Sequence, residues 1–257
     1  MRSIGLPEVL IILGLLVLLF GGARLPGLMG RLGHKVRSTL NQLRWIWQSL
    51  AGSEDEEIRA EETVGREEAA RFLEHMPPVA DENLQGRVGA VGDRLARTNH
   101  AATRHFSFHV VEGPMANAYA FPGGYVFVTR RLAELCGDDE ETAFLLGHEM
   151  GHILCRHFAE NKVMTTLLGA LRAGRLATEL LGKGYSQQQE HEADLKGLEL
   201  IRQADFPGDG ALRLLRKFHQ LAPGPPEFAQ YFSTHPTAAE RIEAVSGALA
   251  ASVRQRV

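Results

Sequence analysis

The pattern that most limits how this 257-residue chain can fold is a pair of histidines, His148 and His152, with Glu149 directly after the first. Residues four apart project from the same face of an α-helix, so a helix here presents both imidazoles to one point. A single zinc ion needs this arrangement from two imidazoles, and the adjacent glutamate can reach a zinc-bound water without ligating the metal. Asp138 and Glu141 form a candidate capping box for the start of this helix. The pattern alone leaves open a polar helix turn with two ordinary histidines.

A catalytic zinc site needs a third protein ligand, and a later segment supplies a candidate. Glu190 and Asp194 are again four apart, on a helix that we expect to run to about Arg202. Glu190 can ligate zinc, while Asp194 can accept a hydrogen bond from a ligand histidine and fix its tautomer. His191 and Glu192 have suitable chemistry, but neither shares the face of Asp194. The alternative is a solvated acidic helix start.

The residues before the histidine pair predict a small sheet. Residues 106–111 alternate as a strand does, and residues 117–121 and 125–128 flank a Pro-Gly-Gly turn in a hairpin pattern. Helical spacing dominates the other residues from about position 72 to the end of the sequence. We therefore expect an α+β fold, mostly helical with a small β-sheet, over residues 72–257.

The first fifty residues have a different character. Residues 9–20 form an apolar run that reaches only about 15–17 residues with its flanks, short against the ~20 of a spanning helix. A cleaved signal peptide, a buried core helix and a short membrane anchor are all compatible with it. Residues 25–50 then place leucines and Trp47 on one helix face, with basic residues mostly elsewhere. Such a helix suits a membrane interface, and packing on its own domain is the alternative.

The charge distribution favours the membrane anchor. No acidic residue lies between Glu8 and Glu54, so the basic part of the chain is expected to meet an anionic surface. Membrane lipid fits better than nucleic acid, because an apolar run precedes the basic residues. The glutamate- and arginine-rich residues 51–71 are expected to form a solvated linker, helical in part.

About the first 45 residues resemble the TatA/TatB subunits of the twin-arginine protein translocase. The resemblance is carried, in the order and spacing of that family, by Gly5-Leu6-Pro7-Glu8, the apolar run, Phe20-Gly21 and Arg24-Leu25-Pro26. It implies an anchor in residues 1–50, made of a short transmembrane helix and an amphipathic helix on the cytoplasmic face, with translocase components as candidate partners. The positive-inside rule independently predicts a single-pass protein of the bacterial inner membrane with its second domain in the cytoplasm. The periplasmic side is the alternative.

The second domain resembles the gluzincin zinc metallopeptidases of the HtpX, BepA and CAAX-prenyl-endopeptidase group. The matching stretches are His148-Glu149-Met150-Gly151-His152, Glu190-x-x-Ala193-Asp194, Asn117-Ala118-Tyr119-Ala120-Phe121-Pro122-Gly123-Gly124, Arg156-His157 and Ser233-Thr234-His235-Pro236 with Arg241-Ile242. The resemblance spans roughly residues 70–245 and implies a zincin-like fold with one Zn²⁺ per chain.

Together the pattern and the resemblance imply roles for individual residues. The expected zinc ligands are His148, His152 and Glu190, with Asp194 behind a ligand histidine and Glu149 as the catalytic base. The strand of Asn117, Ala118, Tyr119 and Ala120 is expected to bind an extended substrate.

Three further residues near these motifs are His235, Arg241 and His157, and the first two have alternative roles. The resemblance implies that His235 lies by the zinc, where it stabilises the oxyanion or occupies the open position in a latent form. A plain helix-start histidine is the alternative. Arg241 could support Asp194 or the substrate, or form an ordinary ion pair. His157, five residues after His152, falls on another helix face and is expected to be structural.

The sequence thus predicts a membrane-anchored zinc metalloendopeptidase acting on protein or peptide substrates, with envelope protein quality control as its candidate role. The alternative is a translocase-associated binding or scaffold protein that retains a zinc fold. The intact Glu149 argues against that alternative, because a scaffold needs no catalytic base.

Overall fold

The computed structural model describes Asn41 and residues 54–98, 104–158, 184–222, 225–235 and 238–254. The transmembrane and amphipathic helices expected in residues 1–50 lie outside these residues, apart from Asn41. Among the helices of the described ranges, none combines the length and the apolar character needed to cross a membrane.

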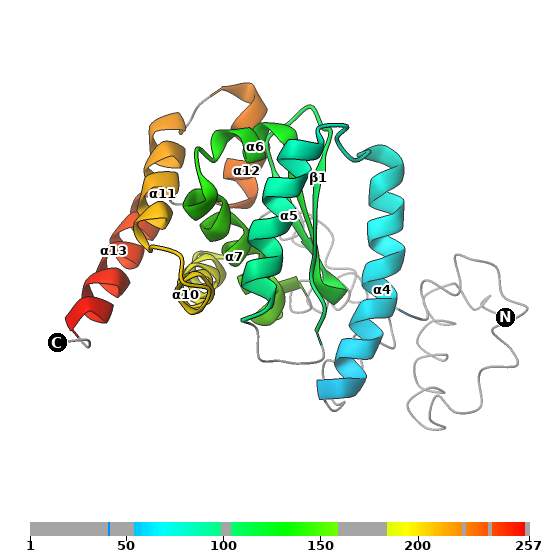
Figure 1. The fold of residues 1–257 in the computed structure, drawn as a ribbon, viewed down its shortest axis with the longest axis horizontal. Helices are drawn as coiled ribbons and strands as arrows, with labels where there is room; N and C mark the ends of the chain where they lie inside the picture. The colour runs from blue at the N-terminus through cyan, green and yellow to red at the C-terminus, as the bar shows by residue number, and fades with distance from the viewer. Residues whose placement is uncertain are drawn as a thin grey trace, which may run out of the picture.

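A three-stranded sheet forms the middle layer of the domain (Figure 1). It consists of β1 (Ser107–Val111), β2 (Ala118–Phe121) and β3 (Tyr125–Thr129), in the order β1-β3-β2. β3 is parallel to β1 and antiparallel to β2, which leaves β2 at one edge. The predicted hairpin is confirmed. Its turn is a 3-10 helix, η2 (Pro122–Gly124), in which Gly123 and Gly124 have φ of 76° and 87°, a region that glycine enters without steric cost.

Helix α4 (Glu54–His75) covers one face of the sheet (Figure 1). The Phe72 ring lies 4.8 Å from the Tyr119 ring and 4.9 Å from the Phe127 ring. Near the other end of α4, Glu61 is 6% exposed, pairs with Arg104 and accepts a hydrogen bond from the backbone of the η2 turn. The helical part of the expected linker is therefore present, but it packs on the domain instead of standing in solvent.

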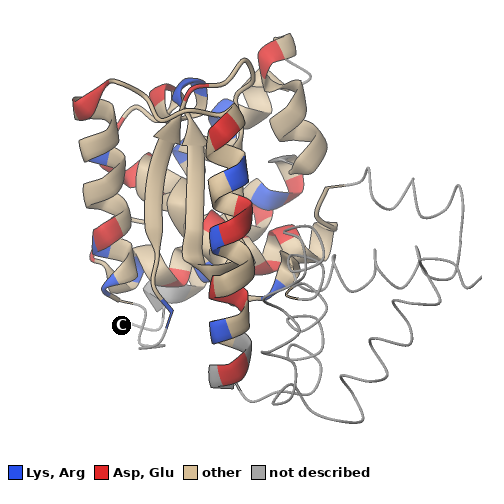
Figure 2. Ribbon diagram, turned by 90° about the vertical axis from the view of Figure 1, so that its right-hand side faces the viewer, with Lys and Arg blue, Asp and Glu red and all other residues tan. Residues whose placement is uncertain are grey.

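The outward face of α4 explains this difference. Figure 2 shows acidic and basic residues alternating along the side of α4 that faces away from the sheet. These charged residues dominate the composition of the segment and suggest a solvated helix. The face that packs on the domain contains only a few apolar residues, such as Ile58, Val64 and Ala69.

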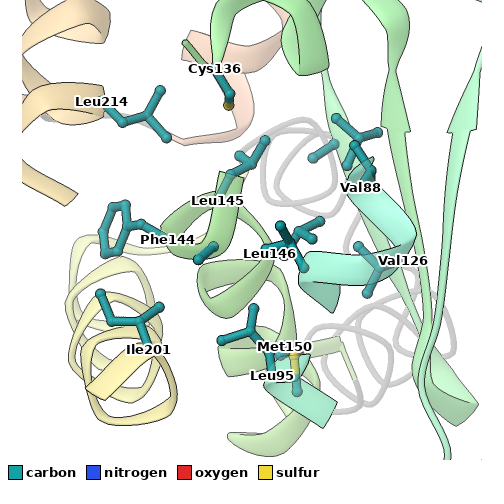
Figure 3. Close-up of a cluster of buried hydrophobic side chains, with 14 of the residues drawn as sticks. Val88, Leu95, Val126, Cys136, Phe144, Leu145, Leu146, Met150, Ile201 and Leu214 are labelled. Atoms are coloured by element: carbon teal, nitrogen blue, oxygen red, sulfur yellow. The ribbon is translucent and has the colours of Figure 1, made fainter. Parts of the chain in front are cut away.

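Helices α5 (Glu82–Ala96) and α7 (Asp139–Leu154) cover the opposite face of the sheet and enclose the main core. Figure 3 shows Met150 of α7 beside Leu95 of α5, and Phe144 beside Ile201. The predicted cap of α7 is confirmed for Asp138, whose side chain accepts from the Glu141 backbone at 2.9 Å. The side chain of Glu141 accepts instead from Gly137, so the reciprocal half of the capping box is absent.

The remaining elements complete the helical part of the fold. They are α6 (Arg130–Leu135), α10 (Gln187–Gln203), α11 (Asp209–Leu221), η3 (Pro226–Phe228), α12 (Ala229–Thr234) and α13 (Ala238–Arg254). The described residues thus form a mostly helical α+β domain with a small mixed sheet, as the sequence predicts.

The crossing of α7 and α10 is the packing contact that positions the site. A Cβ atom added at Gly151 would lie 2.6 Å from the Ala193 carbonyl oxygen, and one at Gly197 would lie 3.0 Å from the backbone nitrogen of His148. Real Cβ atoms essentially never show the first distance, and the second is tighter than most real Cβ contacts. Small residues on both helices therefore let the two backbones approach closely enough for their polar side chains to meet.

Candidate metal centre and active site

Four buried side chains from three parts of the chain converge behind the edge strand. They are His148 and His152 of α7, Glu190 in the first turn of α10, and His235, which follows α12. One ligand atom from each lies within 4.8 Å of all the others. The structure therefore brings together the three expected zinc ligands and the histidine whose position was less certain.

The distances among the three expected ligands fit one small cation. The Nε2 atoms of His148 and His152 lie 3.1 Å apart. The Glu190 Oε1 lies 3.3 Å from the His152 Nε2, and the Glu190 Oε2 lies 3.7 Å from the His148 Nε2. Zinc binds nitrogen and oxygen at ~2.0–2.1 Å in tetrahedral geometry, which separates neighbouring ligand atoms by about 3.4 Å.

The hydrogen bonds behind the histidines support the same conclusion. The His148 Nδ1 lies 2.9 Å from an oxygen of Asp194 and donates to it, which leaves the Nε2 of His148 with its lone pair. This lone pair is directed at the position shared with His152 and Glu190, where a cation is the natural occupant. The two nitrogens and one carboxylate suit zinc, the metal used by this type of site.

Asp194 is itself held by a buried guanidinium. The Arg241 Nε donates to Asp194 Oδ2 at 2.8 Å and its Nη2 donates to Oδ1 at 2.7 Å. Burial opposes ionisation of Asp194, but the charge of Arg241 and the hydrogen bond from His148 outweigh it and lower the Asp194 pKa to about 2. Of the three roles considered for Arg241, contact with Asp194 is the one that the structure displays.

Glu149 lies next to the candidate ligands without joining them. It is 1% exposed, and its Oε1 has no hydrogen-bond partner among the described residues. Burial raises the pKa of the Glu149 carboxyl. Its Oε1 is 3.8 Å from the Nε2 of His235, so both groups face the same small space.

His235 approaches the candidate ligands through its other nitrogen. The Nδ1 atom lies 2.9 Å from a Glu190 oxygen and 3.3 Å from the His148 Nε2. Burial disfavours the charged imidazolium, but the carboxylate of Glu190 outweighs it and raises the His235 pKa. The His235 imidazole is therefore buried beside the three candidate ligands, as the resemblance implies, and is not a surface histidine at a helix start.

A cleft of about 260 Å³ runs from Glu149 and His235 to the edge strand, and Tyr185 also lines it. On its other side are residues 117–121, which include the predicted substrate strand of Asn117, Ala118, Tyr119 and Ala120. The Thr129 N–H donates to the Asn117 carbonyl, so strand alternation turns the backbone groups of Ala118 and Ala120 away from β3, towards the edge that pairs with no other described strand.

The structure contradicts the expectation that His157 lies on another helix face than His152. Helix α7 ends at Leu154, and Arg156 has a φ of 62°, which turns the chain back. The His157 Nδ1 consequently lies 2.9 Å from the His152 Nδ1, and the His157 ring is 0% exposed. The prediction was wrong because it extended the helical spacing beyond the end of the helix.

Tyr185 is a site residue that no sequence pattern indicated. Its ring stacks on the ring of His152, with centroids 3.7 Å apart and an interplanar angle of 18°. A single tyrosine just before a helix carries no periodic signal, so only the folded chain reveals this contact.

Comparison with known families places two matches on the chain. The family model described as peptidase family M48 matches residues 82–177 and 170–249. The model described as the mttA/Hcf106 family, the TatA/TatB-type family, matches residues 2–47.

Individual metalloproteases are similar to this chain over part of its length. Mitochondrial metalloendopeptidase OMA1 of Schizosaccharomyces pombe is 29% identical over 171 residues, which cover 62% of this chain and 51% of that protein. Metalloprotease LoiP of Escherichia coli is 28% identical over 204 residues, or 72% of this chain and 79% of that protein. The beta-barrel assembly-enhancing protease of Escherichia coli is 24% identical over 189 residues, or 65% of this chain and 39% of that protein.

The chain spans about half the length of its yeast OMA1 relatives. The match to the M48 model nevertheless extends over more than half of this chain and includes every residue of the candidate metal group. On this basis the chain belongs to peptidase family M48.

Proposed function

We propose that this chain is a zinc-dependent metalloendopeptidase that hydrolyses peptide bonds in protein substrates. The observation that carries the proposal is the convergence of His148, His152 and Glu190 on one point. A buried carboxylate, Glu149, and the edge of β2 that faces away from β3 lie at the same cleft. Its membership of a peptidase family and the names of its metalloprotease relatives support the same activity.

In this proposal His148, His152 and Glu190 hold one zinc ion. Bound zinc lowers the pKa of a water molecule towards about 7 and polarises the scissile carbonyl. Glu149 accepts the proton that the attacking water loses and donates it to the nitrogen of the leaving amine. Glu149 lies at the cleft beside the candidate ligands, which is where this mechanism needs a group that accepts and returns a proton.

Asp194 and His235 have supporting roles. Asp194 accepts the Nδ1–H of His148 and so keeps the Nε2 of that ligand free for metal. His235 can donate to the carbonyl oxygen as negative charge develops there, or its Nδ1 can take the open metal position in a latent form. The Nδ1 of His235 lies 2.9 Å from a Glu190 oxygen and its Nε2 lies 3.8 Å from Glu149, so the imidazole borders both the candidate ligands and the cleft.

The substrate binds along β2 as an additional antiparallel or parallel strand. The outward backbone groups of Ala118 and Ala120 supply hydrogen bonds that do not depend on the substrate's side chains. The small side chains of both alanines point into the core, while the ring of Tyr119 packs on Phe72 of α4.

We further propose that residues 1–50 anchor the domain in a bacterial inner membrane. The match of residues 2–47 to the mttA/Hcf106 family supports a membrane segment, and the basic residues after it favour a cytoplasmic peptidase domain. In this division residues 51–71 lie between the anchor and the peptidase domain of residues 72–257, and most of them belong to α4, which packs on the sheet of that domain. A relative named beta-barrel assembly-enhancing protease supports a role in envelope protein quality control. Membrane lipid and translocase components are the proposed partners of the anchor.

Hydrolysis of an unfolded protein by the full chain in detergent or membranes tests the activity. Wild type is expected to carry one zinc per chain and to cleave. Glu149→Gln should keep the zinc but lose activity by about 10²–10⁴-fold, as expected for removal of a general base. Glu199→Gln changes an exposed carboxylate of α10 and serves as the matched control.

The alternative function, a scaffold with a retained zinc fold, predicts a different outcome. Wild type and Glu149→Gln would then be equally inactive on unfolded and membrane substrates, while membrane anchoring and partner binding persist. A wild-type chain without zinc, and with no difference in metal content from His148→Ala, would exclude the metal site itself.

The side of the membrane requires its own measurement. Protease added to spheroplasts should leave the C-terminal domain intact if it is cytoplasmic. Digestion of the domain from outside would assign it to the periplasm.

A further inference from the structure

We propose that His157 and Glu192 are positioning residues that fix the ring orientation and the tautomer of the zinc ligand His152. This inference rests on the proposed zinc site, and it adds a support for His152 that is separate from the support of His148 by Asp194. The chain of contacts runs from His152 through the buried ring of His157 to Glu192 at the surface.

The backbone at the end of α7 is shaped to bring His157 to this position. Cys155 closes the helix by donating to Gly151, and the N–H of Arg156 donates to the Ile153 carbonyl at 3.1 Å. Arg156 then adopts a φ of 62°, which residues other than glycine rarely do. A continued helix would have carried His157 to another face, so this turn is the feature that returns its imidazole to His152.

The donor and the acceptor of each hydrogen bond between His152, His157 and Glu192 can be assigned by starting from Glu192 at the surface. The His157 Nε2 lies 3.1 Å from a Glu192 oxygen. An ionised carboxylate only accepts, so the Nε2 of His157 carries the hydrogen. The Nδ1 of a neutral His157 is then an acceptor, and it lies 2.9 Å from the His152 Nδ1, which must be the donor.

This assignment leaves His152 in the form that a metal requires. With its hydrogen on Nδ1, His152 has a free lone pair on Nε2, the atom that faces the Nε2 of His148 at 3.1 Å. Tyr185 restricts the same ring from its face by stacking at a centroid distance of 3.7 Å. The hydrogen bond to His157 therefore sets the tautomer, and the two contacts together limit rotation of the ring.

The charge of the site gives a reason for a neutral intermediary. Glu190 and Asp194 are both buried carboxylates, and the single guanidinium of Arg241 lies against both of them. With Glu149 the site already holds three buried carboxylates, and a fourth behind His152 would add further buried negative charge. The imidazole of His157 avoids this, because it passes the hydrogen bond outward to Glu192, whose side chain is 44% exposed.

Zinc affinity of the full-length chain, measured by competition with a chelator, tests the proposal with zinc alone as the probe. His157→Phe keeps a ring but removes both nitrogens, and its zinc affinity should fall about 10–100-fold, the usual effect of losing a partner behind a metal ligand. His157→Gln keeps one acceptor and one donor on a planar group, and it should restore most of the affinity.

Glu192 ends this series of contacts at the surface, so it can be substituted without changing the buried part of the site. Glu192→Ala removes the acceptor and should weaken zinc binding several-fold, whereas Glu192→Gln keeps an acceptor oxygen and should bind nearly as wild type. Glu199→Ala is the matched control, because Glu199 is on the same helix with a side chain 41% exposed and contacts Lys196. Its zinc affinity should equal that of wild type.

A spectroscopic measurement separates positioning from a general structural role. In ¹⁵N spectra of the imidazoles, zinc-loaded wild type should show His152 with its hydrogen on Nδ1 in a slowly exchanging hydrogen bond. That hydrogen should exchange faster in Glu192→Ala and more so in His157→Phe.

Unchanged zinc affinity in a folded His157→Phe chain would overturn the proposal. If that variant does not fold, Glu192→Ala decides the question, and affinity equal to Glu199→Ala overturns it. These outcomes are distinct from a failure of the proposed function, in which wild type itself binds no zinc or cleaves no substrate.

Discussion

Arg241 and Asp194 form a bidentate ion pair in the interior of the molecule, with N···O distances of 2.8 Å and 2.7 Å. Arg241 is 4% exposed and Asp194 is 0% exposed. They belong to α13 and α10, so the pair joins the C-terminal helix to the helix that supplies Glu190. The pair is therefore both a support for the metal centre and a tertiary link.

Arg241→Met should strongly destabilise the chain, because it leaves the carboxylates of Asp194 and Glu190 buried without their cation. Breaking a buried pair by removing one partner costs about 3–5 kcal/mol. Urea unfolding of the zinc-free chain measures the loss. The control is Arg130→Met, which breaks partly exposed pairs with Asp81, Glu112 and Glu134 and should change the unfolding free energy far less. Equal losses for the two variants would contradict the structural role of Arg241.

Gly151→Ala should lower both stability and zinc affinity. The new methyl group would lie 2.6 Å from the Ala193 carbonyl oxygen, so α7 and α10 must separate. Overpacking of this kind costs about 1–3 kcal/mol, and the shift moves His152 away from Glu190. Gly86→Ala is the matched control on α5, where nothing lies within 4 Å of the added Cβ. That variant should gain about 0.5–1 kcal/mol, since alanine favours the helix. A stable Gly151→Ala chain with full zinc affinity would show that the close crossing is not required.

Removal of zinc should lower thermal stability, because the metal binds the folded site and not the unfolded chain. Free zinc at about 1,000 times the dissociation constant would add about 4 kcal/mol to the unfolding free energy. Thermal unfolding with and without chelator measures this difference. His148→Ala should show no response to zinc. A wild-type melting temperature that does not depend on zinc would argue against a site formed by folding.

Methylation of substrate backbone nitrogens should reduce cleavage with a period of two residues. A substrate strand added to β2 directs every second N–H at the outward carbonyls of that edge. Each lost hydrogen bond should lower kcat/KM by about 3–10-fold, while the intervening positions should tolerate the methyl group better. Kinetics on a series of singly methylated peptides provides the measurement. A uniform effect at all positions would argue against strand addition.

Local features of the fold were predictable because they depend on short sequence periods. The four-residue spacing of His148 and His152 predicts one helix face, and that prediction is confirmed. The hairpin around the two glycines and the cap at Asp138 are equally local, since they depend on φ preferences and one side-chain hydrogen bond. The four-residue spacing of Glu190 and Asp194 predicts a shared helix face in the same way, but the meeting of Glu190 with the histidines depends on a packing contact that spacing alone does not contain.

Three features were decided by tertiary structure. The burial of α4 was hidden by the charges on its outer face, and the contacts of Tyr185 lacked any sequence pattern. The position of His157 was mispredicted, because the left-handed turn at Arg156 ends the helical periodicity.

By itself, then, the sequence determined the helix that carries His148, Glu149 and His152, the hairpin with its edge strand, and the types of ligand available. The tertiary structure alone decided that Glu190 and His235 reach the same point and which partners lie behind each ligand histidine. The physical reason is distance along the chain. Propensities and spacing act over a few residues, whereas this site depends on the close approach of α7 and α10, which only their small residues and the surrounding core make favourable.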